Sequence, residues 1–362
     1  MTLHSNARGP GQPTGETLLS DSALPSYSHE FITRFQGRLF GMLTLPHGSR
    51  GQANLPGMIL LGGSEGGVFT AMAEHFAGMG FATLTVAYLS DRNGLNTPHG
   101  ATSCPKWSEL PIVASMIPLE SFKEPVEWLC GRSYVDGANV SLHGASYGGM
   151  LALALASQFP DLFKTVAAIT PSSLVLSGVD RRLFGKKWED YEPAEKERAA
   201  HLSKATIFSL GGKNYPANTY KVDNQHDPYR GRIPVEKIAS PTFIVSGERD
   251  KRWVLEEFWG QPLPHCFNAE RIGDALLQTE GGKYFFKNYS ENGHSFLPEH
   301  VALKMWQGRD GDASQESFDK IASLFGGKDG PSVRDASNNA WQEYERFLRD
   351  NGALQRLVCT AR

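Results

Sequence analysis

The sequence predicts an α/β fold in which a mostly parallel sheet is covered by helices. Short apolar runs, typical of strands buried on both faces, alternate with segments of helical periodicity, and the connections between them are short. This alternation indicates successive βαβ units. The runs expected to form strands are residues 38–45, 57–61, 81–87, 139–143, 165–169, 242–246 and 283–287. The segments expected to form helices are residues 68–79, 120–130, 148–159 and 339–348.

The local pattern justifies each element. Residues 57–61 form a continuous apolar run between Pro56 and Gly62, as expected for a strand with no solvent-exposed face. Residues 148–159 are rich in Ala and Leu, which favour helices. Helical spacing in residues 120–130 is carried by Phe122, Val126 and Leu129. The last helix has its apolar and aromatic side chains on one face: Ala340, Trp341, Tyr344, Phe347 and Leu348.

Composition excludes several classes of protein. Apolar residues make up 40% of the 362 and charged residues 21%, so the chain is neither disordered nor a coiled coil. Lys and Arg number 36 against 39 Asp and Glu, and the net charge of −3 provides no positive field for nucleic acid. No apolar stretch approaches the about 20 residues of a membrane span, and no secretory signal is recognisable. We therefore expect a soluble, cytoplasmic protein.

The strongest chemical signal is the motif Gly144-Ala-Ser-Tyr-Gly148, which follows a predicted strand and opens a predicted helix. In that context GxSxG forms a nucleophile elbow, a tight turn that exposes the hydroxyl of its serine. The glycines on either side allow the sharp turn and let the helix pack against the strand. Ser146 is therefore the candidate nucleophile, and the expected fold is the α/β-hydrolase fold with an inserted cap.

This fold implies a division of the chain. Residues 1–27 are rich in Gly, Ser and Pro and are expected to form a flexible tail, and residues 28–362 are expected to form one hydrolase domain. Periodicity weakens between residues 172 and 236, a stretch too long for a structureless loop. We expect this stretch to be a lid with short helices of its own.

A serine nucleophile needs a base and an acid to orient that base. In α/β hydrolases the acid and then the histidine follow the serine along the chain. Asp250 comes directly after the strand 242–246 and is the favoured acid, with Glu248 as its local rival. His294 lies in a loop after the last strand and is the favoured base. The other histidines considered for this role are His143, expected in the core, His226 and His265 in Pro-rich loops, and His300.

Acyl transfer also needs N–H donors directed at the developing oxyanion. The N–H of Tyr147, the residue after the nucleophile, is the first candidate, and the loop Gly62-Gly-Ser-Glu-Gly-Gly67 is expected to supply the second. Within that loop we favour Ser64, with Gly63 and Glu65 next to it. A phosphate-binding loop is excluded because neither GxxxxGK[ST] nor GxGxxG is present, and no HExxH or Cys cluster suggests a metal. No cofactor is expected.

Several segments together resemble the catalytic domain of the acyl-CoA thioesterase / bile acid-CoA:amino acid N-acyltransferase family. They cover residues 30–350 in order: Pro56 to Gly67, Ile117-Pro-Leu-Glu120, the elbow, Ile233-Pro-Val-Glu-Lys-Ile238, Ser246-Gly-Glu-Arg-Asp250 with Trp253, Asn292-Gly-His294, Gly326-Gly327 and Ala340-Trp341. The resemblance implies that Ser146, Asp250 and His294 are nucleophile, acid and base. It also implies an immunoglobulin-like domain before the hydrolase, for which the about 55 residues before the first central strand are too few. The N-acyltransferase branch resembles a cysteine enzyme, so Ser146 favours water as the acyl acceptor.

These observations predict a serine hydrolase that cleaves an acyl thioester or carboxylic ester, a small-molecule substrate, through an acyl-enzyme. An amidase or peptidase with the same triad, and a catalytically silent binding module of the same fold, are the alternatives. Five residues of the expected lid are considered as substrate contacts: Leu174, Val175, Leu176, Leu183 and Phe184. Glu65, in the glycine-rich loop, is the remaining substrate-binding candidate. The oligomeric state is not predicted.

Overall fold

The computed structural model describes most of the predicted domain. The described residues are 27–35, 39–49, 54–64, 67–90, 110–183, 188–215, 232–250, 284–290, 292–294, 296–302 and 331–354. The expected tail lies outside these ranges except for Tyr27, which begins the first strand.

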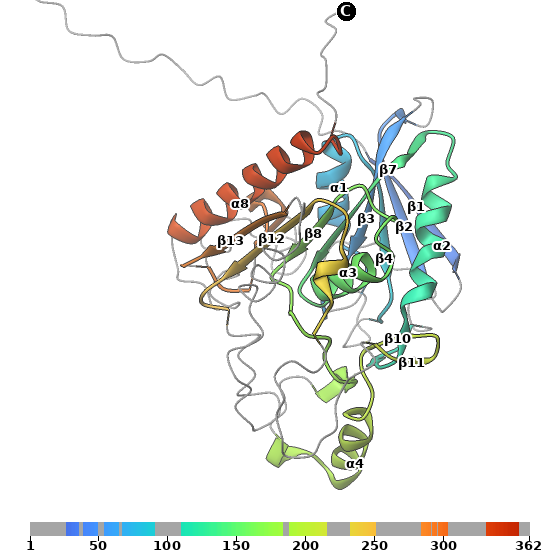
Figure 1. Ribbon diagram of the computed structural model, residues 1–362, viewed down its shortest axis with the longest axis vertical. Helices are drawn as coiled ribbons and strands as arrows, with labels where there is room; N and C mark the ends of the chain where they lie inside the picture. The colour runs from blue at the N-terminus through green and yellow to red at the C-terminus, as the bar shows by residue number, and fades with distance from the viewer. Residues whose placement is uncertain are drawn as a thin grey trace, which may run out of the picture.

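An eight-stranded sheet of order β1-β2-β4-β3-β7-β8-β12-β13 forms the centre of the structure (Figure 1). Its strands are β1 (Tyr27–Phe35), β2 (Leu39–Pro46), β3 (Leu55–Leu61), β4 (Ala82–Ala87), β7 (Val135–Ala145), β8 (Val166–Ile169), β12 (Thr242–Gly247) and β13 (Tyr284–Tyr289). The pairs β1–β2 and β2–β4 are antiparallel, and every pair from β4 to β13 is parallel. The predicted α/β class with a mostly parallel sheet is confirmed.

Helices cover both faces of this sheet. The helices α1 (Thr70–Gly78) and α8 (Pro331–Asp350) pack on one face, and α2 (Lys123–Cys130) and α3 (Tyr147–Gln158) pack on the other. The strand β3 shows why its sequence is apolar throughout. Met58 and Leu60 belong to the core beneath α1 and α8, whereas Ile59 and Leu61 belong to the core beneath α2 and α3. Alternate side chains of a strand point to opposite faces, so a strand covered on both faces needs no polar position.

Three elements differ from the sequence prediction. β1 was not predicted, because it pairs only with β2 and its His29 and Glu30 are exposed, which gives no continuous apolar run. β7 begins at Val135, four residues before the expected start. The helix α8 begins at Pro331, eight residues before the predicted helix; proline is well tolerated at the first position of a helix.

The described parts of the segment expected to form the lid, residues 172–183, 188–215 and 232–236, contain short elements. They are β9 (Val179–Asp180), η5 (Arg181–Leu183), η6 (Trp188–Asp190), α4 (Pro193–Leu202), β10 (Phe208–Leu210), β11 (Lys213–Asn214) and η7 (Val235–Lys237), where η denotes a 3₁₀ helix. Two small sheets connect them to the preceding chain: β9 pairs with β5 (Val113–Ala114), and β10 pairs with β6 (Ile117–Pro118). The 3₁₀ helix η4 (Leu119–Phe122) leads from β6 into α2. In Figure 1, α4 lies at the bottom of the molecule, well away from the large sheet.

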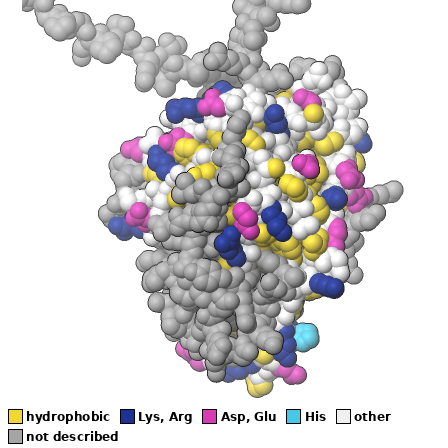
Figure 2. All heavy atoms as spheres, viewed as in Figure 1, with side chains coloured by type: hydrophobic (Ala, Val, Ile, Leu, Met, Phe, Trp, Pro, Cys, Tyr) yellow, Lys and Arg dark blue, Asp and Glu magenta, His cyan; other side chains and the backbone are white. Residues whose placement is uncertain are grey.

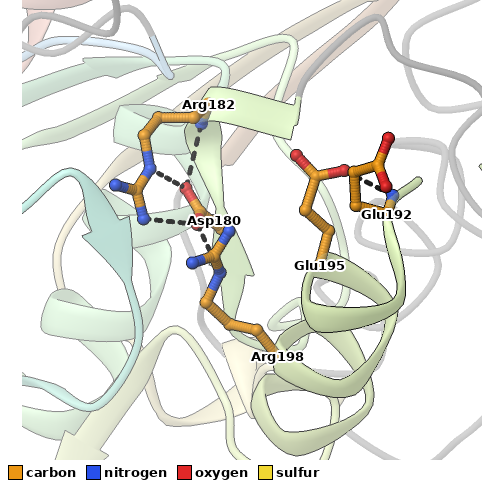
Figure 3. A network of polar contacts seen from close by, with 5 residues as sticks. All are labelled: Asp180, Arg182, Glu192, Glu195 and Arg198. Carbon is orange, nitrogen blue, oxygen red and sulfur yellow. Dashed lines mark hydrogen bonds and ion pairs between the residues drawn. The ribbon is translucent and has the colours of Figure 1, made fainter. Parts of the chain in front are cut away.

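A buried carboxylate holds α4 against β9 (Figure 3). Asp180 is 1% exposed and accepts hydrogen bonds from Arg182 at 2.6 and 2.8 Å, while Arg198 of α4 pairs with it at 2.8 Å. Burial opposes ionisation of Asp180, but the hydrogen bonds and charges of the two arginines hold its pKa below the usual value. A capping box between Glu192 and Glu195 closes the first turn of α4.

The surface carries both signs of charge. Figure 2 shows Lys and Arg side chains interspersed with Asp and Glu over the described part of this face. Within the described residues, no helix has the length and apolar character to cross a membrane.

Candidate active site

Ser146 occupies a sharp turn between β7 and α3. Its backbone has φ 57° and ψ −119°, a conformation that non-glycine residues seldom adopt and that is concentrated at functional sites. Gly144 and Gly148, on either side of the turn, have to be glycines because the backbone packs too closely around them to leave room for a Cβ. A Cβ on Gly144 would overlap the carbonyl of Gly148, and a Cβ on Gly148 would overlap the carbonyl of Leu61. The strand, turn and helix expected for a nucleophile elbow are therefore present.

Three side chains from different strand ends meet at this turn. The Nε2 of His294 lies 2.7 Å from the Oγ of Ser146, and its Nδ1 lies 2.7 Å from Oδ2 of Asp250. A carboxylate can only accept hydrogen bonds, so Nδ1 is the protonated ring nitrogen and donates a hydrogen bond to Asp250. Nε2 then has a free lone pair, which accepts the hydrogen bond of the Ser146 hydroxyl. The side chains of His294 and Asp250 are only 9% and 6% exposed, so solvent screens this arrangement weakly.

Asp250 is positioned by the turn that follows β12. Its N–H donates to the carbonyl of Gly247 at 3.1 Å, and its side chain is buried. The rival acid Glu248 is exposed, and its N–H donates to the carbonyl of Tyr289. The structure therefore brings Asp250, and not Glu248, to His294.

The loop that carries His294 is held against α8. Asn292 donates from its side-chain amide to the hydroxyl of Ser337 at 3.2 Å, and the indole N–H of Trp341 donates to the carbonyl of Phe296 at 3.0 Å. Ser337 and Trp341 are four residues apart and lie on the same face of the helix. The two contacts fix the loop on either side of His294.

The glycine-rich loop after β3 lies against the start of α3. A Cβ on Gly148 would stand only 2.6 Å from the carbonyl of Gly62, so the two backbone segments touch. Gly63 is buried and Ser64 is half-buried. Tyr147, the first residue of α3, is 7% exposed. The structure thus brings the candidate oxyanion donors of both segments to the same end of the sheet.

A fully buried arginine of η5, in the segment 172–236, contacts this loop. Arg181 is 0% exposed, and it donates from Nε to the carbonyl of Ser64 at 2.8 Å and from Nη1 to the carbonyl of Ser90 at 2.7 Å. Tyr88 donates its hydroxyl hydrogen to the carbonyl of Gly62 at 2.8 Å. The carbonyl groups of the loops after β3 and β4 therefore accept hydrogen bonds from Arg181 and Tyr88. Neither residue is among the candidates taken from the sequence.

The candidate substrate contacts are only partly covered by the structure. Glu65 and Phe184 lie outside the described residues. Leu174 and Val175 belong to the main core beneath α2 and α3, and Leu176 is half-buried against it. Leu183 belongs to a separate small cluster with Tyr191 and Ala199.

The other candidate histidines are placed elsewhere or not described. His226 and His265 lie outside the described residues. His300 is exposed, and its Nε2 lies 3.0 Å from Nδ1 of His75 on α1. His143 is 1% exposed between the sheet and α8, with Nδ1 3.4 Å from the hydroxyl of Tyr344. Burial, and secondarily the charge of His75, lower the pKa of His143 to about 3.

No metal-binding group is evident within the part of the chain that the structure describes. There, no three His, Cys, Asp or Glu side chains come together in a way that could hold a metal ion.

A sequence model of the prolyl oligopeptidase family matches residues 118–305, more than half of the chain. The chain belongs to the prolyl oligopeptidase family. The match includes the elbow, Asp250 and His294.

Relatives across most of the chain are acyl-CoA thioesterases. This family member is 26% identical over 313 residues to mouse acyl-coenzyme A thioesterase 5 and 29% identical over 317 residues to human acyl-coenzyme A thioesterase 1. It is also 24% identical over 325 residues to mouse acyl-coenzyme A amino acid N-acyltransferase 2. These matches cover 86%, 86% and 87% of this chain, and 63%, 63% and 64% of the three relatives. The expected relationship to this group is confirmed, although the chain spans slightly less than two thirds of the length of the relatives.

Two hydrolases are among the solved structures that match most of this chain at low identity. An α/β hydrolase from a Medee basin deep-sea metagenome library has a TM-score of 0.47 and 13% identity, and the match covers 91% of this chain and 99% of that one. An esterase from Thermogutta terrifontis has a TM-score of 0.45 and 16% identity, with 89% of this chain and 90% of that one covered.

Proposed function

We propose that this protein is a serine hydrolase that cleaves an acyl thioester or carboxylic ester through an acyl-enzyme. The pair of 2.7 Å contacts that links Ser146, His294 and Asp250 is the observation that carries the proposal. An alcohol is a weak nucleophile until a base removes its proton, and a histidine held in one tautomer by a carboxylate is suited to do so.

In the first half of the proposed reaction, the Oγ of Ser146 attacks the acyl carbon while its proton moves to Nε2 of His294. Asp250 stabilises the resulting imidazolium and keeps its orientation. The N–H of Tyr147 and an N–H of Gly63 or Ser64 hydrogen-bond to the oxyanion. The imidazolium then gives its proton to the leaving thiolate or alkoxide, which departs as the C–S or C–O bond breaks.

In the second half, water attacks the acyl-enzyme. His294 removes a proton from the water, and the same donors hold the second oxyanion. Collapse of this intermediate breaks the bond to Oγ, returns the proton to Ser146 and releases the carboxylic acid. The hydroxyl nucleophile, in place of a thiol, supports water as the acyl acceptor.

The substrate class rests on the relatives. Acyl-CoA thioesterases match most of the chain, which favours a thioester with a large leaving group. We further propose that the lid, including the half-buried Leu176, contributes to the acyl-binding surface.

The family match favours a second candidate function. Because the matching family is that of prolyl oligopeptidase, an amidase or peptidase that uses the same three residues is the alternative. The triad chemistry is the same for amides, and the specificity lies in the groups around it.

One substrate panel separates these functions. The purified chain is assayed with one acyl group attached to coenzyme A, to a nitrophenol and to an aniline, together with a proline-containing peptide anilide. The proposal predicts that kcat/KM is highest for a thioester or ester; a higher value for an anilide would favour the amidase. Turnover of none of these by folded protein would favour the catalytically silent binding module.

Two serine variants control the panel. Ser146→Ala removes the nucleophile and is expected to leave no turnover above the background of the uncatalysed reaction. Ser157→Ala alters a buried serine of α3 that bonds to Ala154 and Tyr215 at the far end of the helix, and should retain wild-type kcat. Wild-type kcat in Ser146→Ala would contradict the proposal.

A further inference from the structure

Thr170 holds a strained backbone conformation at the end of β8. Its φ is 45°, in the left-handed region. A β-branched residue at positive φ is a steric outlier, and Pro171 disfavours the conformation further because residues before proline prefer extended backbone. Such strain persists only where the surrounding structure imposes it, and it is concentrated at functional sites.

The contacts of Thr170 connect the three strand ends of the candidate site. Its N–H donates to the carbonyl of Val245 on β12, the strand that leads to Asp250, at 2.8 Å. The adjacent carbonyl of Ile169 accepts the N–H of Ser146 at 2.9 Å. The hydroxyl of Thr170 donates to the backbone carbonyl of His294 at 3.0 Å.

This last contact differs from the other anchors of the histidine loop. The bonds to α8 hold Asn292 and Phe296, two residues before and two residues after His294. Thr170 holds the peptide of His294 itself. It is also 1% exposed, so water does not compete effectively for the carbonyl.

We propose that Thr170 is a positioning residue that sets the backbone of His294 so that Nε2 faces Ser146. This inference rests on the proposed function, because it assigns Thr170 a role through the proposed base. Nucleophilic catalysis depends strongly on the position of the base, and a displacement of 1 Å can lower a rate by about 10²-fold. The backbone strain at Thr170 is retained because it aims the hydroxyl at the His294 carbonyl.

The first test compares Thr170→Val with Thr170→Ser. Valine keeps the shape of threonine but removes the donor, and serine keeps the hydroxyl. With a short-chain aryl ester, Thr170→Val is expected to lower kcat by about tenfold to 10²-fold with KM nearly unchanged, because binding does not depend on the position of the base. Thr170→Ser should recover most of the lost kcat. Equal kcat in wild type and Thr170→Val would overturn the proposal, as would a loss that serine does not rescue.

Thr165 supplies the matched control. It lies immediately before β8, is 1% exposed and donates its hydroxyl hydrogen to Ser141 at 2.9 Å, at the end of the strand away from the site. Thr165→Val removes an equivalent buried hydroxyl and should lower stability without changing kcat. A similar loss of kcat in both valine variants would show that the effect is structural.

A glycine variant covers the case in which Thr170→Val does not fold. Glycine adopts positive φ without strain, so Thr170→Gly tolerates the backbone of this position while lacking the hydroxyl. The proposal predicts a folded protein with a reduced kcat; wild-type kcat in this variant would overturn it.

A fluorophosphonate, which reacts covalently with activated serines, separates this inference from the proposed function. Wild-type protein that neither turns over ester nor labels at Ser146 would contradict the proposed function, whereas labelled, active wild type with equally active Thr170 variants would contradict only the role of Thr170.

Discussion

Two residues at adjacent strand ends, Ser146 and Thr170, have positive φ values of 57° and 45°. Each such conformation costs about 1–3 kcal/mol, which the packing of the sheet and helices has to offset. The N–H of Ser146 donates a hydrogen bond to the carbonyl of Ile169, the residue before Thr170, so the two strained residues lie on neighbouring strand ends. Of the four non-glycine residues with positive φ in the described part of the chain, these two therefore lie where the nucleophile and the histidine loop meet, and the other two are Asn54 and Met116.

The role of Asp250 can be tested by replacing one oxygen of its carboxylate with an amide nitrogen. Asp250→Asn replaces the carboxylate with an amide that can donate to Nδ1 and so favour the tautomer in which Nε2 cannot act as a base. In a serine protease the equivalent change lowers kcat by about 10⁴-fold, and we expect a loss of about 10³-fold to 10⁴-fold here with the fold intact. Steady-state kinetics with the best ester or thioester measures this loss. Glu248→Gln, two residues away and exposed, is the control and should retain wild-type kcat. Similar effects of the two substitutions would contradict the assignment.

At the scale of single residues, the sequence predicts those site residues that lie in a recognisable motif or directly after a recognisable strand. Ser146, Asp250 and His294 each follow a recognisable strand, and parallel strands bring such positions to one edge. Thr170 also follows a strand, but its backbone angle cannot be read from the sequence. Arg181 lies in a segment without periodicity, and its burial depends on contacts with distant loops.

At the scale of elements, Arg181 links the segment 172–236, the proposed lid, to the loops after β3 and β4. A fully buried arginine is rare unless its donors are satisfied, and here Nε and Nη1 reach the carbonyls of Ser64 and Ser90. The proposed lid therefore contributes hydrogen bonds to the loop from which we expect an oxyanion donor.

Arg181→Lys tests this link. Lysine keeps the charge but lacks the planar fork that reaches two carbonyls at once, and an unsatisfied buried group costs about 1–3 kcal/mol. We expect a lower melting temperature and, because the oxyanion loop is displaced, a fall in kcat of up to about 10²-fold. Arg198→Lys, a half-exposed lid residue bonded to Asp180, is the control for destabilising the lid alone. A destabilised Arg181→Lys protein with wild-type kcat would show that the lid does not position the loop.

The elements themselves were predicted to different degrees. The central strands and α3 were predicted well because strands buried on both faces and an Ala- and Leu-rich helix leave clear patterns. The elements of residues 172–236 were not individually predicted. Two-residue strands and single-turn 3₁₀ helices are too short to show a period, and the ten-residue helix α4 buries only Ala199 and Leu202, which gives no apolar periodicity.

At the scale of the whole molecule, two histidines, the buried His143 of β7 and the half-buried His75 of α1, make stability depend on pH. Burial is the main cause that lowers the pKa of His143 to about 3 and that of His75 to about 4. In the unfolded chain both groups ionise near their ordinary value of 6.5, so below that pH the unfolded chain binds more protons. The free energy of unfolding therefore falls as the pH is lowered from about 6.5 towards 4.

For His143 alone, the loss between pH 7.5 and pH 5 is about 2 kcal/mol. Urea unfolding of the wild type and of His143→Gln at both pH values measures it. The variant should lose about 2 kcal/mol less than the wild type over this interval. His201→Gln, which alters an exposed histidine of α4, should behave as the wild type does. An equal loss in His143→Gln and the wild type would contradict the contribution assigned to His143.

The central claim is that Ser146 is activated by His294, and covalent labelling tests it most directly. The purified chain is incubated with a fluorophosphonate, and the modified peptide is identified by mass spectrometry. The claim predicts one adduct per chain, on Ser146, and labelling that is slower by orders of magnitude in folded His294→Ala. Folded wild type that forms no adduct, an adduct on another residue, or equal labelling rates in the two proteins would contradict it.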